Sequence, residues 1–531
     1  MKYHPTFLHR MSFMTFQWRT AIGKTPIFLL LFINTWLTPG LAAMFLAALA
    51  PPAAGLTSEH QQSSESICRD QLGSNIDAVI NRPQFRRARW GILIQLLSSD
   101  EKNRASTINK DHTLYSHDAQ HFFIPASNIK LLTTATALRQ LGSAFRIRTS
   151  VYDTGAGSLR VVGRGDPSLT DVQLKDLAQQ LKRQGVRYVR HLVVDDGYFQ
   201  GDVINLSWEW EDIQADYGAS VNSLILNQNA VKLTLSPQKL GQPLQVSWAD
   251  AIAAKQWRVE NDSVTAEAGT SATVTLSGVL GQSVLRIKGQ LAVDAQPKSF
   301  GLAILNPAEY FLQHFRNVLE AEGIQVRRAS VVNNVGTVGE RELAAVESPP
   351  LSVLLVETNQ QSNNLYAEAL LRSLQASAFV KLGVDANNDS SQVGLNKVES
   401  TLTDLGVDPN SYVLADGSGV SRHNLVSPEA IAQTLKLMAH TPQAAVYRAS
   451  LPTAGVSGTL QRRFLNTAAQ GYLQAKTGTM TGVSALSGYL DVPSYQPVVF
   501  SIMVNQSDQS ATNLRGAIDE IILLLTRLRS C

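Results

Sequence analysis

Apolar residues recur at helical spacing in several well-separated segments of the chain. Pro83 stops the first of these segments, and Gly142 ends the second. On this pattern we expect helices over residues 67–83, 127–141, 171–185, 308–324, 351–359, 364–375 and 514–528.

Short runs rich in apolar and β-branched residues form a second pattern, which predicts strands. A strongly apolar run at 90–99 precedes the helix expected at 127–141. Three further runs near the C-terminus follow one another as antiparallel strands, at 473–479, 485–492 and 498–505.

Between about 146 and 300 the sequence pattern changes. Short β-rich runs alternate there with turns, and only one clear helix interrupts them. This pattern predicts a separate, mostly β domain inserted into a larger one. The expected organisation is a first part at 66–148, an inserted part at 149–300 and a second part at 301–531.

The first 57 residues differ from the rest. An almost wholly apolar stretch at 26–50 follows four basic residues, and residues 1–57 contain no acid. A positive flank before an apolar segment is typical of an export signal. The stretch is also long enough to span a bilayer, so both a cleaved signal peptide and an uncleaved membrane anchor fit residues 1–57. Either way we expect export to the periplasm or cell envelope, with membrane association through this segment in the second case.

Composition narrows the class of protein. Hydrophobic residues make up 44% and charged residues 17% of the 531 positions, as in a globular chain of two or three domains. Without the four N-terminal basic residues the formal charge falls from +3 to −1. A near-neutral body gives no electrostatic case for binding nucleic acid.

The two cysteines, Cys68 and Cys531, lie near the two ends of the chain. In an exported protein such a pair can form a disulfide, provided that the N- and C-terminal segments are neighbours. Two free thiols are the alternative.

A Ser-x-x-Lys motif opens the helix expected at 127–141. Ser127 and Lys130 are three residues apart, so on a helix they share one face, and the helix N-terminus suits a nucleophilic serine. The same pattern is compatible with a simple helix cap. A second copy, Ser236 to Lys239, follows a strand and contains a proline, which is typical of a turn.

Two later stretches add to this. Ser362 and Asn364 open the helix at 364–375, although an ordinary N-cap also explains them. Lys476-Thr477-Gly478-Thr479 falls on a predicted strand, where small residues let a substrate backbone run alongside and the lysine can hold a carboxylate.

The order Ser-x-x-Lys, Ser-x-Asn, Lys-Thr-Gly resembles the signature set of the penicillin-recognising serine acyl enzymes. Because 235 residues separate Ser127 from Ser362, the chain is similar to one branch, the D-alanyl-D-alanine carboxypeptidase/endopeptidases of the DacB or penicillin-binding protein 4 type (peptidase family S13). Further stretches support the likeness: 163–170, 195–201, 208–231 and 415–428. The position before the first tryptophan, usually glycine in the family, is Ser207 here.

The resemblance implies a fold of mixed α/β (α+β) class, a β-lactamase/transpeptidase-like domain with an antiparallel sheet flanked by helices and split by the inserted domain. It implies a serine-type hydrolase without a cofactor. Its substrates would be peptidoglycan peptides ending in D-Ala-D-Ala or cross-bridges from D-Ala to diaminopimelate, and β-lactams would be covalent inhibitors.

The resemblance also implies residue roles. Ser127 attacks the penultimate D-Ala carbonyl, and Lys130, kept neutral by burial and by the charge of Lys476, is the general base. Ser362 relays the proton to the leaving amine. Backbone N–H groups of Ser127 and Thr479 form the oxyanion hole.

Further implied roles concern the substrate. Asn364 holds the substrate amide, and Thr477 with Thr479 holds the terminal carboxylate beside Gly478. Arg422 lies near the side chain of the stem peptide. Asp212, with Tyr217, binds the amino end of diaminopimelate. A structural salt bridge for Asp212 and a surface charge for Arg422 are the alternatives.

No metal site is expected. Asp385, Asn387 and Asp389 have the spacing of a calcium loop, but Ser390 stands where that loop needs glycine and Asn396 where it needs glutamate.

Two other functions are compatible with the same fold. A β-lactamase or esterase needs fast deacylation, for which no base is evident in the sequence. A non-enzymatic wall-binding domain has no need of Lys130.

Overall fold

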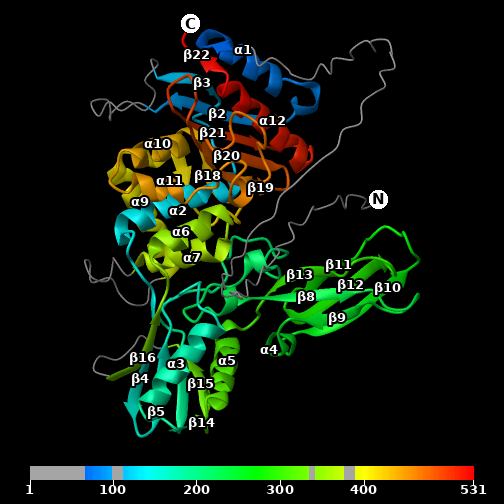
Figure 1. Ribbon diagram of the computed structural model, residues 1–531, viewed down its shortest axis with the longest axis vertical. Helices are drawn as coiled ribbons and strands as arrows, with labels where there is room; N and C mark the ends of the chain where they lie inside the picture. The colour runs from blue at the N-terminus through cyan, green and yellow to red at the C-terminus, as the bar shows by residue number, and fades with distance from the viewer. Residues whose placement is uncertain (1–65, 98–111, 334–340, 376–388) are drawn as a thin grey trace, which may run out of the picture. The chain divides into compact units, whose positions relative to one another are not determined.

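A five-stranded antiparallel sheet joins segments from both ends of the chain (Figure 1). The computed structural model describes residues 66–97, 112–333, 341–375 and 389–531. The sheet has the strand order β19-β20-β21-β2-β3. Its strands are β2 (Arg89–Leu96), β3 (Thr113–His117), β19 (Leu473–Met480), β20 (Val483–Leu490) and β21 (Val498–Asn505).

Helices cover both faces of this sheet. Side chains alternate along a strand, and in β21 Val498 and Phe500 face one core while Val499 and Met503 face another. The first core also contains α1 (Arg69–Ile80) and α12 (Ala511–Leu525), and the second contains α2 (Ile129–Leu141) and α10 (Pro428–Ala439). The predicted antiparallel sheet flanked by helices is therefore confirmed.

Helix α2 is surrounded by other helices, and every residue from Ile129 to Leu138 is buried. Its neighbours besides α10 are α6 (Leu351–Gln360), α7 (Asn364–Ser373), α9 (Ser390–Leu405) and α11 (Ala444–Ala449). This packing explains why the segment after Ser127 is apolar or small on all sides.

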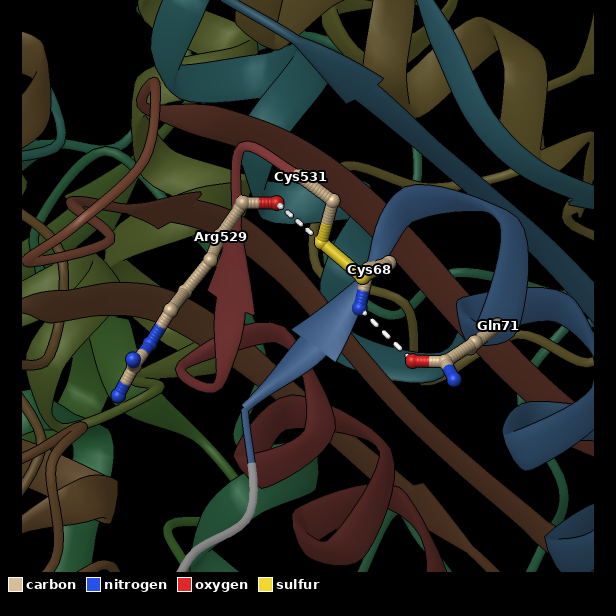
Figure 2. The surroundings of a disulfide bond; sticks show 4 residues. All are labelled: Cys68, Gln71, Arg529 and Cys531. Atoms are coloured by element: carbon tan, nitrogen blue, oxygen red, sulfur yellow. Dashed lines mark hydrogen bonds between the residues drawn. A yellow bond between two sulfur atoms is a disulfide. The ribbon is translucent and has the colours of Figure 1, made fainter.

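The two ends of the described chain are held together. β1 (Ile67–Cys68) pairs in parallel with β22 (Leu528–Arg529). Cys68 and Cys531 form a disulfide with 5.7 Å between their Cα atoms (Figure 2). The N- and C-terminal segments are thus neighbours, which is the condition that the disulfide required.

The chain leaves this part through β4 (Arg148–Gly155) and returns through β16 (Arg341–Glu347), and the two strands pair so that Arg148 lies opposite Glu347. They belong to a mixed five-stranded sheet in the order β15-β7-β5-β4-β16. The other members are β5 (Ser158–Val162), β7 (His191–Asp195) and β15 (Ala329–Val332), with α3 (Asp171–Arg183) and α5 (Pro307–Ala321) in the same core.

The remaining inserted strands form two three-stranded sheets, β13-β8-β9 and β10-β12-β11. They comprise β8 (Ala230–Ser236), β9 (Gln245–Trp248), β10 (Arg258–Ala266), β11 (Thr275–Val279), β12 (Gln282–Ala292) and β13 (Lys298–Ala303). Two short strand pairs and one short helix complete the described strands and α-helices: β6 (Tyr188–Val189) with β14 (Gln325–Val326), β17 (Tyr412–Val413) with β18 (Leu425–Val426), and α4 (Ala251–Ala254).

Strand pairing places β15 and β16 with the inserted sheet, although both follow residue 300. The local sequence pattern could not show this, because pairing between strands far apart in the chain leaves no signal in either strand's own sequence.

The apolar stretch at 26–50 lies outside the described residues, as do Asp385 and Asn387 of the calcium-like spacing. Among the residues that the structure does describe, no helix is long and apolar enough to cross a membrane.

Candidate active site

Ser127 lies in a 3₁₀ turn, Ala126–Asn128, that leads into α2. The helix itself begins at Ile129, two residues later than the sequence pattern suggests. Ala126 has a φ of 47°, a conformation that costs a non-glycine residue about 1–3 kcal/mol. The turn therefore presents Ser127 in a conformation that the surrounding structure must enforce.

Gly419 is one of the residues that hold this turn. A Cβ atom at position 419 would lie 2.0 Å from the carbonyl oxygen of Ala126, and Gly419 itself has a φ of 85°. Only glycine allows the loop backbone to approach the turn so closely.

Lys130 Nζ has three acceptors around it. It lies 3.0 Å from Ser127 Oγ, 2.6 Å from Asn364 Oδ1 and 2.5 Å from the carbonyl oxygen of Ser418. The i, i+3 relation predicted from the motif is thus present in the structure, and α7 and the 415–424 loop supply the other two contacts.

Lys130 is fully buried, and burial lowers the pKa of its amine to about 7. The carboxylates of Asp416 and Glu368 act in the opposite direction and raise this pKa. Burial is therefore the main cause of the lowered pKa, and the neighbouring acids oppose it.

Ser362 is held by Lys476, whose Nζ donates to Ser362 Oγ at 2.9 Å and to the Thr477 carbonyl at 2.9 Å. Burial, followed by the positive charge of Lys130, holds the pKa of Lys476 well below its usual range. Ser362 also has a positive φ of 59°. Strained non-glycine backbone of this kind is concentrated at functional sites.

β19 is the edge strand of its sheet, and it contacts the Ser127 turn. Near its start, Ala475 donates its N–H to Pro452, and Leu473 accepts from Ala454, both away from β20. Since backbone groups of alternate residues point the same way, those of Thr477 and Thr479 also point toward the open edge. An extended peptide can pair there.

Gly478 lets the strand and the turn come together, because a Cβ atom there would lie 2.7 Å from the Pro125 carbonyl oxygen. The Thr477 hydroxyl donates to Thr459 Oγ1 at 2.8 Å. The third motif therefore lies directly beside the first.

The inserted segment contributes Asp212 and Tyr217. Asn364 Nδ2 donates to the Tyr217 carbonyl at 2.8 Å, and the Tyr217 hydroxyl donates to Asp212 Oδ1 at 3.0 Å. Burial raises the pKa of Asp212. The structure thus places both residues next to the Ser-x-Asn motif.

Arg422 lies at the β19–β20 turn. Its guanidinium donates to the Thr481 carbonyl at 3.3 Å and forms a 3.1 Å ion pair with Glu209. Its side chain is 29% exposed, so the guanidinium is partly accessible to solvent.

Sequence reasoning missed Asp416, which organises the loop at 415–424. Its carboxylate accepts from the N–H groups of Gly419 and Ser421, each at 2.7 Å, and from Asn424 Nδ2 at 2.7 Å. A fourth donor, Trp208 Nε1, comes from the inserted segment at 2.9 Å. The quoted loop contained Asp416, but only folding shows which donors converge on it.

Glu368 was missed as well. It lies one turn after Asn364 on α7, is 2% exposed and accepts the Gly417 N–H at 2.9 Å. A glutamate among Ala and Leu residues in a buried helix is a signal that the sequence does contain, since acids are rarely buried without a partner.

Two other sequence features lie apart from this cluster. Ser236 ends β8, and Lys239 follows it in an exposed turn. Within the described ranges, no group of three or more His, Cys, Asp and Glu side chains is arranged to hold a metal ion.

Comparison with protein families and known proteins gives a consistent result. The family model described as the D-Ala-D-Ala carboxypeptidase 3 (S13) family matches residues 72–525. A D-alanyl-D-alanine carboxypeptidase of Actinomadura sp. (strain R39) is 33% identical over 457 residues, which cover 82% of this chain and 81% of the relative. The D-alanyl-D-alanine carboxypeptidase DacB of Haemophilus influenzae is 26% identical over 412 residues, covering 76% and 84%.

Among solved structures, penicillin binding protein 4 (dacB) from Haemophilus influenzae is similar with a TM-score of 0.72 and 23% identity. The match covers 84% of this chain and 97% of that protein. A second structure of that protein, complexed with a β-lactam, matches with a TM-score of 0.68. At this identity the structural likeness shows a shared fold.

Proposed function

Because this chain belongs to the D-Ala-D-Ala carboxypeptidase 3 (S13) family, it is a serine-type D-Ala-D-Ala carboxypeptidase, and we propose that Ser127 is its nucleophile. The surroundings of Lys130 carry this proposal. A neutral amine has two N–H groups and one lone pair. Asn364 Oδ1 and the Ser418 carbonyl are acceptors only, so they take the two N–H groups and leave the lone pair for the Ser127 hydroxyl.

Acylation then proceeds by general base catalysis. Lys130 takes the Ser127 proton as Oγ attacks the carbonyl carbon of the penultimate D-Ala. The oxyanion that forms accepts hydrogen bonds from the backbone N–H groups of Ser127 and Thr479, which stabilise the intermediate.

Collapse of the intermediate breaks the peptide bond and needs a proton on the leaving amine. Ser362 donates its proton to that nitrogen and regains one from Lys130, while Lys476 holds Ser362 Oγ in place. Water then attacks the acyl-enzyme by the reverse roles and releases the shortened peptide. The same acyl step serves a terminal D-Ala and a cross-bridge, so both carboxypeptidase and endopeptidase activity follow from it.

The open edge of β19 receives the substrate. Thr477 and Thr479 hold the terminal carboxylate, and Asn364 holds the substrate amide. Asp212, supported by Tyr217, takes the free amino end of a diaminopimelate side chain, and Arg422 lies nearer the remaining side-chain atoms. A β-lactam enters the same position and acylates Ser127.

We further propose export to the cell envelope through residues 1–57, in keeping with a peptidoglycan substrate. The catalytic part consists of the segments before β4 and after β16, and the inserted part runs between these two strands. Neither a cofactor nor a metal takes part in the proposed steps.

Release of D-alanine from a D-Ala-D-Ala peptide tests the assignment. Ser127→Ala should lower the rate by roughly 10⁴-fold or more. Ser236→Ala, in the second Ser-x-x-Lys copy, is the matched control and should keep the wild-type rate. Undiminished release by Ser127→Ala would refute the proposal, and rapid turnover of penicillin without D-alanine release would favour a β-lactamase.

A further inference from the structure

Helix α7 carries a polar stripe in an otherwise apolar buried helix. Asn364, Glu368 and Arg372 are spaced four residues apart, so they share one face. Glu368 and Arg372 are each 2% exposed. Burying a carboxylate costs several kcal/mol unless hydrogen bonds and charges offset it, and packing alone gives no reason to place one here.

The contacts of Glu368 lead directly to the catalytic lysine. Its Oε1 accepts the Gly417 N–H at 2.9 Å. The Ser418 hydroxyl hydrogen bonds with both Glu368 and Asp416, and its distance to Asp416 Oδ2 is 3.4 Å. The Ser418 carbonyl in turn accepts from Lys130 Nζ at 2.5 Å. Glu368 therefore holds the segment whose carbonyl orients Lys130, while Asn364, one turn earlier, contacts Lys130 itself.

We propose that Glu368 is a positioning residue for Lys130, one that fixes the 417–418 backbone against the amine and whose carboxylate makes the buried amine more basic than it would otherwise be. The proposal rests on the function proposed above, in which Lys130 is the general base. It assigns to the Ser-x-Asn helix a second task besides presenting Ser362 and Asn364.

The charges around Lys130 and Glu368 decide in which direction the loss of the Glu368 charge changes the pKa of Lys130. Lys130 faces Lys476 on β19, Asp416 in the loop and Glu368 on α7. The groups around Glu368 are Asp416 and Arg372, together with Gly417 and Ser418 of the loop that contacts Lys130. Burial lowers the pKa of Lys130, and the two acids bring it back to about 7.

Loss of the Glu368 charge therefore lowers the pKa of Lys130 further. More of the lysine is then neutral at low pH, but the neutral amine is a weaker base, and a base works best when its pKa lies near the working pH. Burial and Asp416 raise the pKa of Glu368 itself to about 7, while its hydrogen bonds and Arg372 oppose this.

The test is the rate constant of acylation by a fluorescent penicillin between pH 5 and 9. Glu368→Gln keeps the size of the side chain and an oxygen for the Gly417 N–H. It should move the midpoint of the rise in rate to lower pH, and lower the plateau several-fold. The shift should be less than the roughly one pH unit expected of a fully charged neighbour, because Glu368 itself becomes neutral below about pH 7. Glu429→Gln, which alters another buried glutamate, should leave the profile unchanged.

A second variant covers the case in which Glu368→Gln does not fold. Ser418→Ala removes the hydroxyl that hydrogen bonds with the carboxylates of Glu368 and Asp416, and it keeps the backbone carbonyl. It raises the pKa of Glu368, so the acid limb should move in the same direction by a smaller amount.

An equal loss of rate at every pH, with the limb unmoved, would mean a merely structural role and overturn the proposal. Acylation of Ser127→Ala would instead overturn the proposed function, so the two failures are distinguishable.

Discussion

The indole nitrogen of Trp208 donates a 2.9 Å hydrogen bond to the carboxylate of Asp416. Both side chains are buried. Trp208 belongs to the segment inserted between β4 and β16, whereas Asp416 fixes the loop whose Ser418 carbonyl contacts Lys130. This contact connects the inserted segment to Lys130 through the loop, in addition to the connection through Asn364, which binds both the Tyr217 carbonyl and Lys130.

Trp208→Phe should slow acylation by roughly tenfold. The variant keeps an aromatic ring and removes one hydrogen bond to a charged group, worth about 1.5–3 kcal/mol, so the loop is held less firmly. The measurement is acylation by a fluorescent penicillin. Trp257→Phe is the matched control, because Trp257 is also a buried tryptophan of the inserted segment, at the same exposure of 8%. Equal rates in the two variants would contradict the proposed link.

Acylation of the wild-type enzyme should rise with pH through about 7. Lys130 acts as a base only when neutral, and its pKa is lowered to about 7, so the neutral fraction grows as the pH passes that value. Stopped-flow acylation rates between pH 5 and 9 measure this. A guanidinium stays protonated over the whole range, so Lys130→Arg should show almost no acylation at any of these values. A wild-type profile that falls as the pH rises through 7 would contradict Lys130 as the base.

Gly419→Ala should lower acylation at least about tenfold and also lower the melting temperature. The added methyl would collide with the Ala126 carbonyl, 2.0 Å away, and push the turn that presents Ser127. Gly323→Ala separates this collision from backbone strain, since Gly323 has a similar φ of 82° and nothing lies within 4 Å of the new Cβ. It should cost about 1 kcal/mol of stability and leave acylation unchanged. Similar acylation losses in both variants would show that the close approach has no catalytic role.

Cys68→Ser should lower the free energy of unfolding by about 2–4 kcal/mol, because the Cys68–Cys531 bond links residues 463 positions apart. Urea unfolding of the variant and of the wild type, each with and without reductant, measures the loss. Reductant should destabilise the wild type only. Acylation at low urea should not change, since the bond lies with β1 and β22 (Figure 2), and neither strand supplies a residue of the Ser127 site. Identical unfolding curves for the two proteins would contradict a stabilising role.

Local sequence patterns predicted the helices and strands well, because the spacing of apolar residues that marks a helix or a strand is visible within a short stretch of the chain. The strands of the C-terminal meander fall at 473–480, 483–490 and 498–505, close to the expected ranges. Pairing of β15 and β16 with the inserted strands, by contrast, joins residues far apart in the chain, and no short window contains that information.

The candidate site divides in the same way. Ser127, Lys130, Ser362 and Lys476 stand in motifs with fixed spacing, and the structure brings them together in two hydrogen-bonded pairs. The charged groups that act on the pKa of Lys130 come from α7, the 415–424 loop and β19, and only the folded chain brings them together. Asp416 and Glu368 therefore became visible through the structure, although both stand next to residues that the sequence singled out.

The identity of the acylated residue tests the central claim most directly. The protein should be treated with benzylpenicillin, its intact mass measured, and the modified peptide sequenced by mass spectrometry. We predict one added penicilloyl group on Ser127, and none in Ser127→Ala. Acylation at another serine, or an unchanged yield of adduct in Ser127→Ala, would contradict the account.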